Sequence, residues 1–354
     1  MTTSAETPAV TPPSGKRPRS GPAGWVGAFT GFYPAKADDL SGLDPITRFL
    51  YAARSVILVI SAQAALIAGL LTITDRRFEW LPFVLVFLGF LVLHAISNLS
   101  NDYFGYRRGH DTEDSPRRRY TLHPVASGVF TMRFLATGLM VLGVVALAIA
   151  GYFVALRGWG AVAFAVIGAI MLYAYDAAPR ALKELGLGEV AAFVVWGPLM
   201  IGGGYYVITG TLSGLAFLAS VPYGLGVASI LVGKHIDQRS FDDGQAQRTL
   251  PVLLGERRAR LLNQAVVAGM YVFVLVGILF GALSPLTVVV ALALPRALRA
   301  LKVMSVPAPA SAPEGYVGWP LWYHRVCLVH NRLFGWLFIL GLLLGAFVPG
   351  WRIG

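Results

Sequence analysis

The sequence predicts an all-α membrane protein, a bundle of nine transmembrane helices. Three observations support this fold class. The chain of 354 residues is 56% hydrophobic and only 13% charged, whereas an ordinary soluble domain carries about 25% charged residues. Its apolar residues come in runs of about 20, the length at which a helix crosses a bilayer. Its charged residues lie almost entirely between these runs.

The nine runs follow one another along the chain and are apolar on every helix face. Helices of soluble proteins instead carry one apolar stripe and one polar face. The eighth run is the weakest, because Pro295, Arg296 and Arg299 interrupt it. In chain order the runs are 55–74, 80–97, 134–156, 159–175, 188–208, 212–232, 262–283, 285–304 and 333–349.

The distribution of the 29 Lys and Arg residues predicts the orientation of the bundle. If the N-terminus lies in the cytoplasm, 25 of them fall on the cytoplasmic side and four on the opposite side. Cytoplasmic loops of membrane proteins carry such an excess. The net charge of +11 therefore indicates membrane orientation rather than nucleic-acid binding. We expect a multi-pass protein of the bacterial cell membrane, with its N-terminus and its polar loops in the cytoplasm.

The segments outside the runs divide the chain into two parts. Residues 1–44 are predicted to be a disordered or poorly ordered cytoplasmic tail, because the first 24 residues are rich in Pro, Ser, Thr, Gly and Ala and lack a hydrophobic core. Residues 45–354 form the membrane domain. Cys327 is the only cysteine, which excludes a disulfide or a cysteine metal cluster within one chain.

An acidic segment follows the second run. Asn98, Asn101 and Asp102 are spaced three and four residues apart, so they share one helix face and can point into a cavity at the membrane edge. Asp111 lies further along the same segment. Carboxylate and amide oxygens suit Mg²⁺, which proteins usually share with substrate phosphates. The alternative is a solvated loop whose acids pair with neighbouring arginines such as Arg107.

A second acidic segment follows the sixth run and carries Asp237 and Asp242. These carboxylates could hold a second metal ion. Lys234 and Arg248 in the same segment could bind phosphate oxygens, as cations do in phosphoryl-group recognition. The alternative is that these cations only anchor the loop on the cytoplasmic side.

A third polar segment follows the fourth run. Tyr175 ends that run, and Arg180 and Lys183 lie on one helix face from which both could contact a diphosphate. Glu189 opens the fifth run near a helix N-terminus, where the helix dipole favours an anion. A structural role and a functional role for Glu189 are therefore equally compatible with the sequence.

These polar segments resemble those of the UbiA superfamily of intramembrane prenyltransferases, over residues 45–349. Within the superfamily the closest likeness is to the 1,4-dihydroxy-2-naphthoate prenyltransferases of menaquinone biosynthesis. The resemblance is carried by Asn98-x-x-Asn101-Asp102-Tyr103 with Gly109-x-Asp111, Gly186-Leu-Gly188-Glu189 with Gly203-x-Tyr205-Tyr206-Val207, and Asp237 with Arg248-Thr249-Leu250.

The resemblance implies a nine-helix bundle around a central cavity and a Mg²⁺-dependent transfer of a prenyl group from an isoprenyl diphosphate to an aromatic acceptor, a quinone precursor such as 1,4-dihydroxy-2-naphthoate. It implies metal ligation by Asn101, Asp102, Asp111, Asp237 and Asp242. It implies catalytic roles for Asp102, Asp237 and Lys183. The substrate-binding residues would be Asn98, Arg107, Tyr175, Arg180, Lys183, Lys234 and Arg248.

The chain departs from the family pattern in both acidic motifs. Gly105 and Phe241 stand where the family usually has carboxylates, and Asp114 or Asp243 could compensate. Three alternatives therefore stay open: an intramembrane terpene cyclase acting on the same donor, a non-catalytic binder of polyprenyl lipids, and a transporter. The sequence gives no information on oligomeric state.

Overall fold

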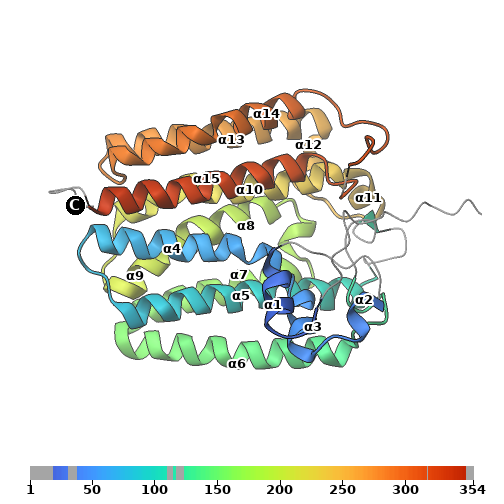
Figure 1. The fold of residues 1–354 in the computed structure, drawn as a ribbon, viewed down its shortest axis with the longest axis horizontal. Coiled ribbons are helices and arrows are strands. Elements are labelled where there is room, and N and C mark those ends of the chain that lie inside the picture. The colour runs from blue at the N-terminus through green and yellow to red at the C-terminus, as the bar shows by residue number, and fades with distance from the viewer. Residues whose placement is uncertain (1–18, 31–37, 110–114, 117–122, 317, 348–354) are drawn as a thin grey trace, which may run out of the picture.

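The computed structural model describes residues 19–30, 38–109, 115–116, 123–316 and 318–347. Its regular secondary structure over these ranges is entirely helical. Eight helices in the described chain are long and apolar enough to cross a membrane. They run side by side along the long axis of the molecule (Figure 1). The predicted all-α membrane fold is confirmed.

The first half of the bundle contains five spans. The helices are α4 Val59–Thr74, preceded by a 3₁₀ turn at Ser55–Ile57, α5 Trp80–Arg107, α6 Met132–Arg157, α7 Trp159–Leu172, which continues as a π-helical stretch at Tyr173–Ala177, and a fifth span made of α8 Gly188–Val194, a π-helical stretch at Val195–Gly202 and α9 Gly203–Thr209.

The second half contains three long spans, α10 Gly214–Asp237, α13 Glu256–Leu279 and α15 Tyr323–Ala346. Two short helices, α11 Arg239–Gly244 and α12 Leu250–Leu254, join α10 to α13. The weak eighth run folds as a 3₁₀ stretch at Pro285–Ala293 followed by α14 Leu294–Met304.

The eighth run packs against α15 through a close backbone approach. A Cβ atom at Gly341 of α15 would lie 2.6 Å from the Cα atom of Thr287, so only glycine fits there without a shift. With this segment, the described chain has the nine helical segments that the sequence predicts.

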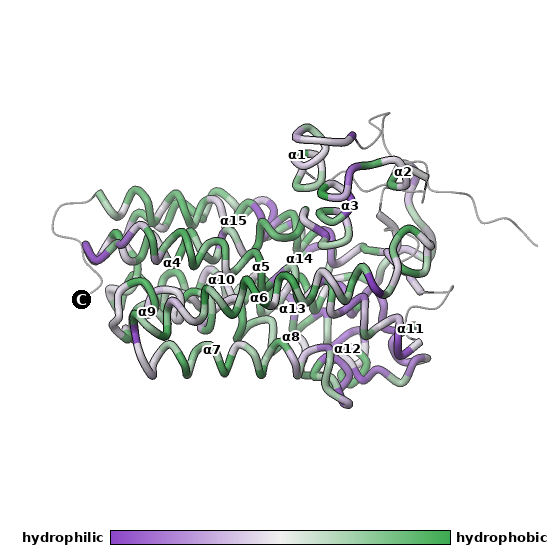
Figure 2. Tube along the Cα trace, turned by 90° about the horizontal axis from the view of Figure 1, so that it is seen from below, coloured by the Kyte–Doolittle hydropathy of each residue, from purple (hydrophilic) through white to green (hydrophobic). Residues whose placement is uncertain are grey.

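Several helices extend past the apolar runs, all at one end of the bundle. α5 continues to Arg107 rather than ending near 97, and α15 begins at Tyr323, ten residues before the predicted run. Figure 2 shows hydrophilic segments gathered at this end, near α11 and α12. An apolar run marks only the part of a helix that lies in lipid. Its length is therefore shorter than that of a helix that continues beyond the bilayer. We call this the polar end of the bundle.

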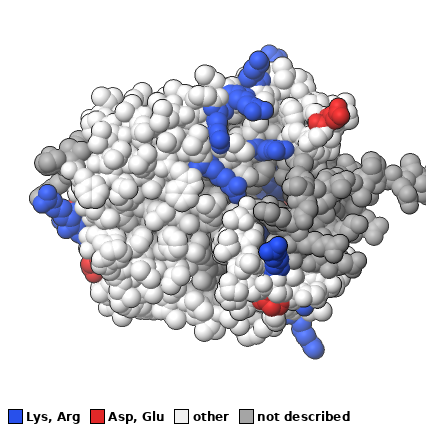
Figure 3. All heavy atoms as spheres, viewed as in Figure 1, with Lys and Arg blue, Asp and Glu red and all other residues white. Residues whose placement is uncertain are grey.

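The outer face of the spans is apolar. Large apolar side chains on α6 and α7 are exposed, among them Leu147 at 74% and Trp159 at 86%. Figure 3 shows that most of the visible face carries no Lys, Arg, Asp or Glu, and that several of its cations gather in the upper part. An apolar, uncharged outer face is what contact with lipid requires.

Part of the predicted tail is folded. Helix α1 Pro22–Thr30 and the short helix α2 Asp38–Ser41 precede α3 Pro45–Ala52. Asp44 caps α3 by accepting the backbone N–H groups of Ile46 and Thr47, and it also accepts the N–H of Gly21 at 2.8 Å. The Thr47 hydroxyl and the N–H groups of Gly21 and Thr47 hold the pKa of the Asp44 carboxyl well below its usual range. Asp44 thus ties α1 to α3.

Candidate functional site

A cavity of about 650 Å³ lies inside the bundle and opens toward its polar end. Residues from α4, α5, the π-helical stretch after α7, α10 and α15 meet there. The polar and charged side chains that line this part of the cavity are Arg54, Asn98, Asn101, Tyr175, Asp176, Lys234, His324, Arg325 and Arg332.

The remainder of the cavity is apolar. Its walls come mainly from α5, α6, α7 and α9, and include Phe90, Phe153, Phe164 and Val207. Along α5 the lining residues extend from Leu85 to Asn101. At 1.5 Å per residue, this corresponds to a length of about 24 Å. The site therefore combines a polar end with a long apolar chamber.

The first acidic motif is fixed by an arginine that the sequence analysis did not single out. Arg54 forms an ion pair with Asp102, whose side chain is fully buried. Arg54 also donates to the backbone oxygen of Asn98 at 3.3 Å and to Oδ1 of Asn101 at 3.4 Å. Asn98 in turn donates to the Ala53 carbonyl at 2.9 Å. Asn98 and Asn101 line the cavity, as their spacing predicts, whereas Asp102 does not line it and is buried in its ion pair with Arg54.

Asp176 is a second carboxylate at this end of the cavity. Its Oδ1 accepts from Nδ2 of Asn101 at 2.9 Å and pairs with Nζ of Lys183 at 2.6 Å. Its Oδ2 is buried and has no hydrogen-bond partner among the described residues. Asp176 lies in the π-helical stretch, a geometry frequent at functional sites. Its neighbour Tyr175, which was predicted from the sequence to bind substrate, also lines the cavity, whereas Asp176 was not predicted.

Asp237 is not among the residues that line the cavity, and its metal-ligand and catalytic roles stay predictions. Its Oδ1 accepts the N–H of Tyr323 and its Oδ2 the N–H of His324, each at 2.9 Å. The first N–H groups of a helix have no partner within the helix, and the dipole there favours an anion. Asp237 therefore caps α15, a helix start that the apolar pattern did not show.

We expect Asp237→Asn to act mainly on stability. An amide can accept only one of the two N–H groups and turns its own NH₂ toward the other, which costs on the order of 1–3 kcal/mol. Thermal unfolding in detergent should show a lower midpoint than for Asp243→Asn, a neighbouring exposed acid. A wild-type midpoint combined with lost turnover would instead support the metal-ligand role of Asp237.

The second acidic segment forms a buried group beside the cavity. Asp242 accepts a hydrogen bond from the Thr249 hydroxyl at 3.4 Å. Burial raises the pKa of the Asp242 carboxyl above its ordinary value, while His235 and Lys234 act in the opposite direction. Glu189 pairs with Nδ1 of His235 at 2.6 Å. Of the residues predicted in this segment, only Lys234 lines the cavity.

Most of the basic residues predicted to bind substrate lie outside the cavity. Arg107, Arg180 and Arg248 are exposed and do not line the cavity, and Lys183 binds Asp176. Asp111 lies outside the described residues. The cations that line the cavity are Arg54, Lys234, Arg325 and Arg332. The apolar pattern did not indicate the last two, because the final apolar run starts ten residues after the helix does.

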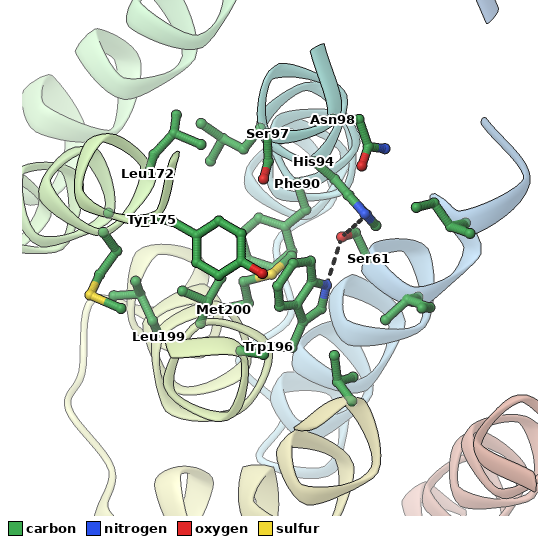
Figure 4. Close-up of a pocket in the computed structure, with 18 of the residues that line it drawn as sticks. Ser61, Phe90, His94, Ser97, Asn98, Leu172, Tyr175, Trp196, Leu199 and Met200 are labelled. Atoms are coloured by element: carbon green, nitrogen blue, oxygen red, sulfur yellow. Dashed lines mark hydrogen bonds between the residues drawn. The ribbon is translucent and has the colours of Figure 1, made fainter. Parts of the chain in front are cut away.

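A third polar group lies deeper in the cavity. Ser61 of α4 contacts Nδ1 of His94 at 2.8 Å and accepts from Nε1 of Trp196 at 3.0 Å. The rings of His94 and Trp196 meet edge to face, with centroids 5.1 Å apart. We call Ser61, His94 and Trp196 the inner polar cluster. Figure 4 shows that the Tyr175 ring lies beside it within the cavity.

Comparison with known proteins identifies relatives of this chain. Residues 62–313 match the model of the UbiA prenyltransferase family. The chain is 24% identical over 295 residues to 1,4-dihydroxy-2-naphthoate octaprenyltransferase of Bacillus subtilis (strain 168), covering 82% of this chain and 90% of that protein. It is 31% identical over 213 residues to the protein of the same name from Mycobacterium tuberculosis, covering 57% and 67%.

The fold is also shared with solved structures. A UbiA homolog from Archaeoglobus fulgidus bound to GPP and Mg²⁺ superposes with a TM-score of 0.58 at 16% sequence identity, covering 84% of this chain and 99% of that chain. At this identity, the likeness establishes a common architecture.

Proposed function

Because this chain belongs to the UbiA prenyltransferase family, we propose that it transfers a prenyl group from an isoprenyl diphosphate to a hydroxylated aromatic acceptor, a quinone precursor of the 1,4-dihydroxy-2-naphthoate type. One observation carries this proposal: the cavity joins a cation-lined end to a long apolar chamber. A prenyl diphosphate has the same division, with a polyanionic head and an apolar tail.

The cations at the polar end match the chemistry of the donor. Cleavage of the allylic C–O bond builds negative charge on the leaving diphosphate. Cations fixed where that charge develops stabilise the transition state. Lys234, Arg325 and Arg332 line this end from α10 and α15, and Arg54 faces it from the segment before α4. We assign these residues to binding of the diphosphate.

Magnesium fits this end of the cavity. Asn101 and Asp176 line this end and supply amide and carboxylate oxygens, and the buried Oδ2 of Asp176 has no described protein partner. Asp102 lies next to Asn101 in the chain, paired with Arg54. The described residues contain no cluster of three His, Cys, Asp or Glu side chains arranged as a complete cage. Mg²⁺ commonly completes its ligand shell with substrate phosphates. When bound, it neutralises charge on the leaving diphosphate.

The apolar chamber has two roles in this proposal. It buries the prenyl tail, and it excludes water that would otherwise react with the allylic cation. Membrane spans enclose it, and the Lys and Arg excess supports a cytoplasmic location for its polar end in a bacterial cell membrane. The names of the relatives from Bacillus subtilis and Mycobacterium tuberculosis support a dihydroxynaphthoate acceptor.

Metal removal tests the proposed donor chemistry. The purified protein in detergent would be given geranylgeranyl diphosphate and 1,4-dihydroxy-2-naphthoate, and release of diphosphate would be measured. We expect release with Mg²⁺, its loss with EDTA and its return when Mg²⁺ is added in excess. Release that continues at the same rate in EDTA would contradict the proposed use of magnesium.

The chamber also allows a prediction about the donor. A Cβ atom at Gly168 would meet no atom within 4 Å, although Gly168 lines the cavity. Gly168 lies two helical turns from Tyr175, about 10 Å along the helix. We expect Gly168→Phe to fill the chamber at this depth and to lower turnover of long donors roughly 10-fold or more relative to geranyl diphosphate, since a buried clash costs about 1–3 kcal/mol.

Competition between geranyl and longer prenyl diphosphates, followed by mass spectrometry of the products, measures this change in preference. Gly143→Phe is the matched control, because Gly143 also has open space around its Cβ position but does not line the cavity. An unchanged product distribution in Gly168→Phe would show that the tail does not occupy this chamber.

A further inference from the structure

The inner polar cluster has a defined hydrogen-bond direction. Trp196 can only donate, so the Ser61 oxygen accepts from its indole N–H. No other described acceptor contacts the Ser61 hydroxyl, so its proton points to Nδ1 of His94. A neutral imidazole whose Nδ1 accepts carries its own proton on Nε2. The cluster therefore presents an Nε2–H donor from His94.

This donor has no partner within the described protein. No hydrogen bond joins Nε2 of His94 to a described residue, and His94 lines the cavity. His94 is only 7% exposed and Ser61 is fully buried. An N–H donor at a cavity wall that no protein group satisfies favours a ligand with an acceptor. Because His94 lines the cavity, a substrate bound there can reach this donor.

The depth of the cluster distinguishes its ligand from the diphosphate. His94 precedes Asn101 by seven residues, so it lies on the same face of α5 about 10 Å deeper in the bundle. The four cavity cations surround the polar end, whereas the cluster contains no Lys or Arg. With the diphosphate at the polar end, the cluster flanks the first carbons of the prenyl chain, where the acceptor ring must come.

We propose that Ser61, His94 and Trp196 form the acceptor subsite, in which Nε2–H of His94 donates to a ring oxygen of the acceptor. Ser61 and Trp196 are positioning residues that fix the tautomer of His94. Tyr175 and Trp196 supply aromatic walls for the acceptor ring (Figure 4). This proposal rests on the proposed function and names the chemical class it selects: an aromatic ring that carries a hydroxyl or phenolate oxygen.

Two substitutions at His94 distinguish the role of Nδ1 from that of Nε2. The side-chain amide of Asn lies near the position of Nδ1, so His94→Asn keeps the contact to Ser61 and loses the donor to the cavity. The longer amide of Gln reaches the position of Nε2. We expect His94→Asn to raise the KM for 1,4-dihydroxy-2-naphthoate on the order of 10-fold, without changing the KM for the prenyl diphosphate. His94→Gln should recover part of the loss.

Substitution of Ser61 tests the tautomer without changing the histidine. In Ser61→Ala, Nδ1 loses the proton donor that keeps the ring proton on Nε2. We expect the acceptor KM to rise, and the preference for a hydroxylated acceptor over its deoxy analogue to shrink. The matched controls are His330→Asn, whose imidazole contacts Tyr271 outside the cavity, and Ser220→Ala, whose hydroxyl donates to the Phe217 carbonyl. Both should keep the wild-type acceptor KM.

The outcomes separate this inference from the proposed function. If wild-type protein prenylates the acceptor but His94→Asn and Ser61→Ala keep its acceptor KM, the acceptor subsite lies elsewhere. An equal rise in the KM values of donor and acceptor would mean that the cluster only supports the fold, and would also overturn the assignment. If wild-type protein prenylates no aromatic acceptor, the proposed function itself fails.

Discussion

Asp176→Asn is expected to lower the turnover of prenyl transfer on the order of 10²–10³-fold, because it removes a carboxylate that would hold the Mg²⁺ that neutralises the leaving diphosphate. The substitution keeps the shape of the side chain and its contact to Asn101. It removes the charge of a carboxylate whose Oδ2 is buried without a described partner. The Mg²⁺ concentration at half-maximal rate should rise as well, since a neutral amide is a weaker ligand for a hard cation.

The control is Asp243→Asn, an exposed acid of the second segment that does not line the cavity. It should retain the wild-type rate and Mg²⁺ dependence. Lys183→Met provides a second comparison, because Lys183 pairs with Asp176 but does not itself line the cavity. A smaller loss is expected there than in Asp176→Asn. Wild-type turnover in folded Asp176→Asn protein would exclude Asp176 from the metal and diphosphate site.

The ion pair between Arg54 and Asp102 should have the largest effect on stability. Removing one member of a buried pair leaves an uncompensated charge, which costs about 3–5 kcal/mol. Asp102 is fully buried and Arg54 is 18% exposed, so we expect either Arg54→Gln or Asp102→Asn to lower the thermal midpoint strongly. The double variant carries neither charge and should recover much of that loss.

The double variant should regain stability without regaining activity. Arg54 faces the diphosphate end of the cavity, and its ion pair with Asp102 holds it there, so the double variant is expected to be folded but at least ~100-fold slower. Differential scanning fluorimetry and kcat measured on the same preparations separate the two effects. Additive losses of stability in the double variant would show that the two side chains do not interact in the way the structure indicates.

Much of the fold follows from the sequence because lipid imposes a simple rule. A spanning helix must be apolar over the bilayer thickness, so the run at 55–74 coincides with the observed span Ser55–Thr74. The same rule says nothing about helix ends outside the lipid. The last helix therefore begins at Tyr323 rather than 333, and the position of Asp237 at its start was not visible in the apolar pattern.

The candidate site was only partly predictable for a related reason. Spacing along α5 brought Asn98, Asn101 and Asp102 together correctly, since residues three and four apart share a helix face. Arg54 and Asp176 come from other elements and meet this motif only through tertiary packing. No periodicity within one segment reports such contacts.

The inner polar cluster could not be predicted from the sequence for the same reason. Ser61, His94 and Trp196 lie within three separate apolar runs, and none of them stands out in the sequence. Their hydrogen bonds become visible only when α4, α5 and the π-helical stretch after α8 are packed around one cavity. Isolated polar residues inside spans are therefore worth comparing across helices.

The central claim is that the cavity joins a prenyl diphosphate to an aromatic acceptor, and mass spectrometry of the product tests it most directly. Purified protein would receive Mg²⁺ and geranylgeranyl diphosphate, with and without 1,4-dihydroxy-2-naphthoate. We predict a prenylated naphthalene product, together with diphosphate, only when the acceptor is present. Diphosphate release without acceptor, accompanied by a cyclised hydrocarbon, would contradict the claim and identify a terpene cyclase instead.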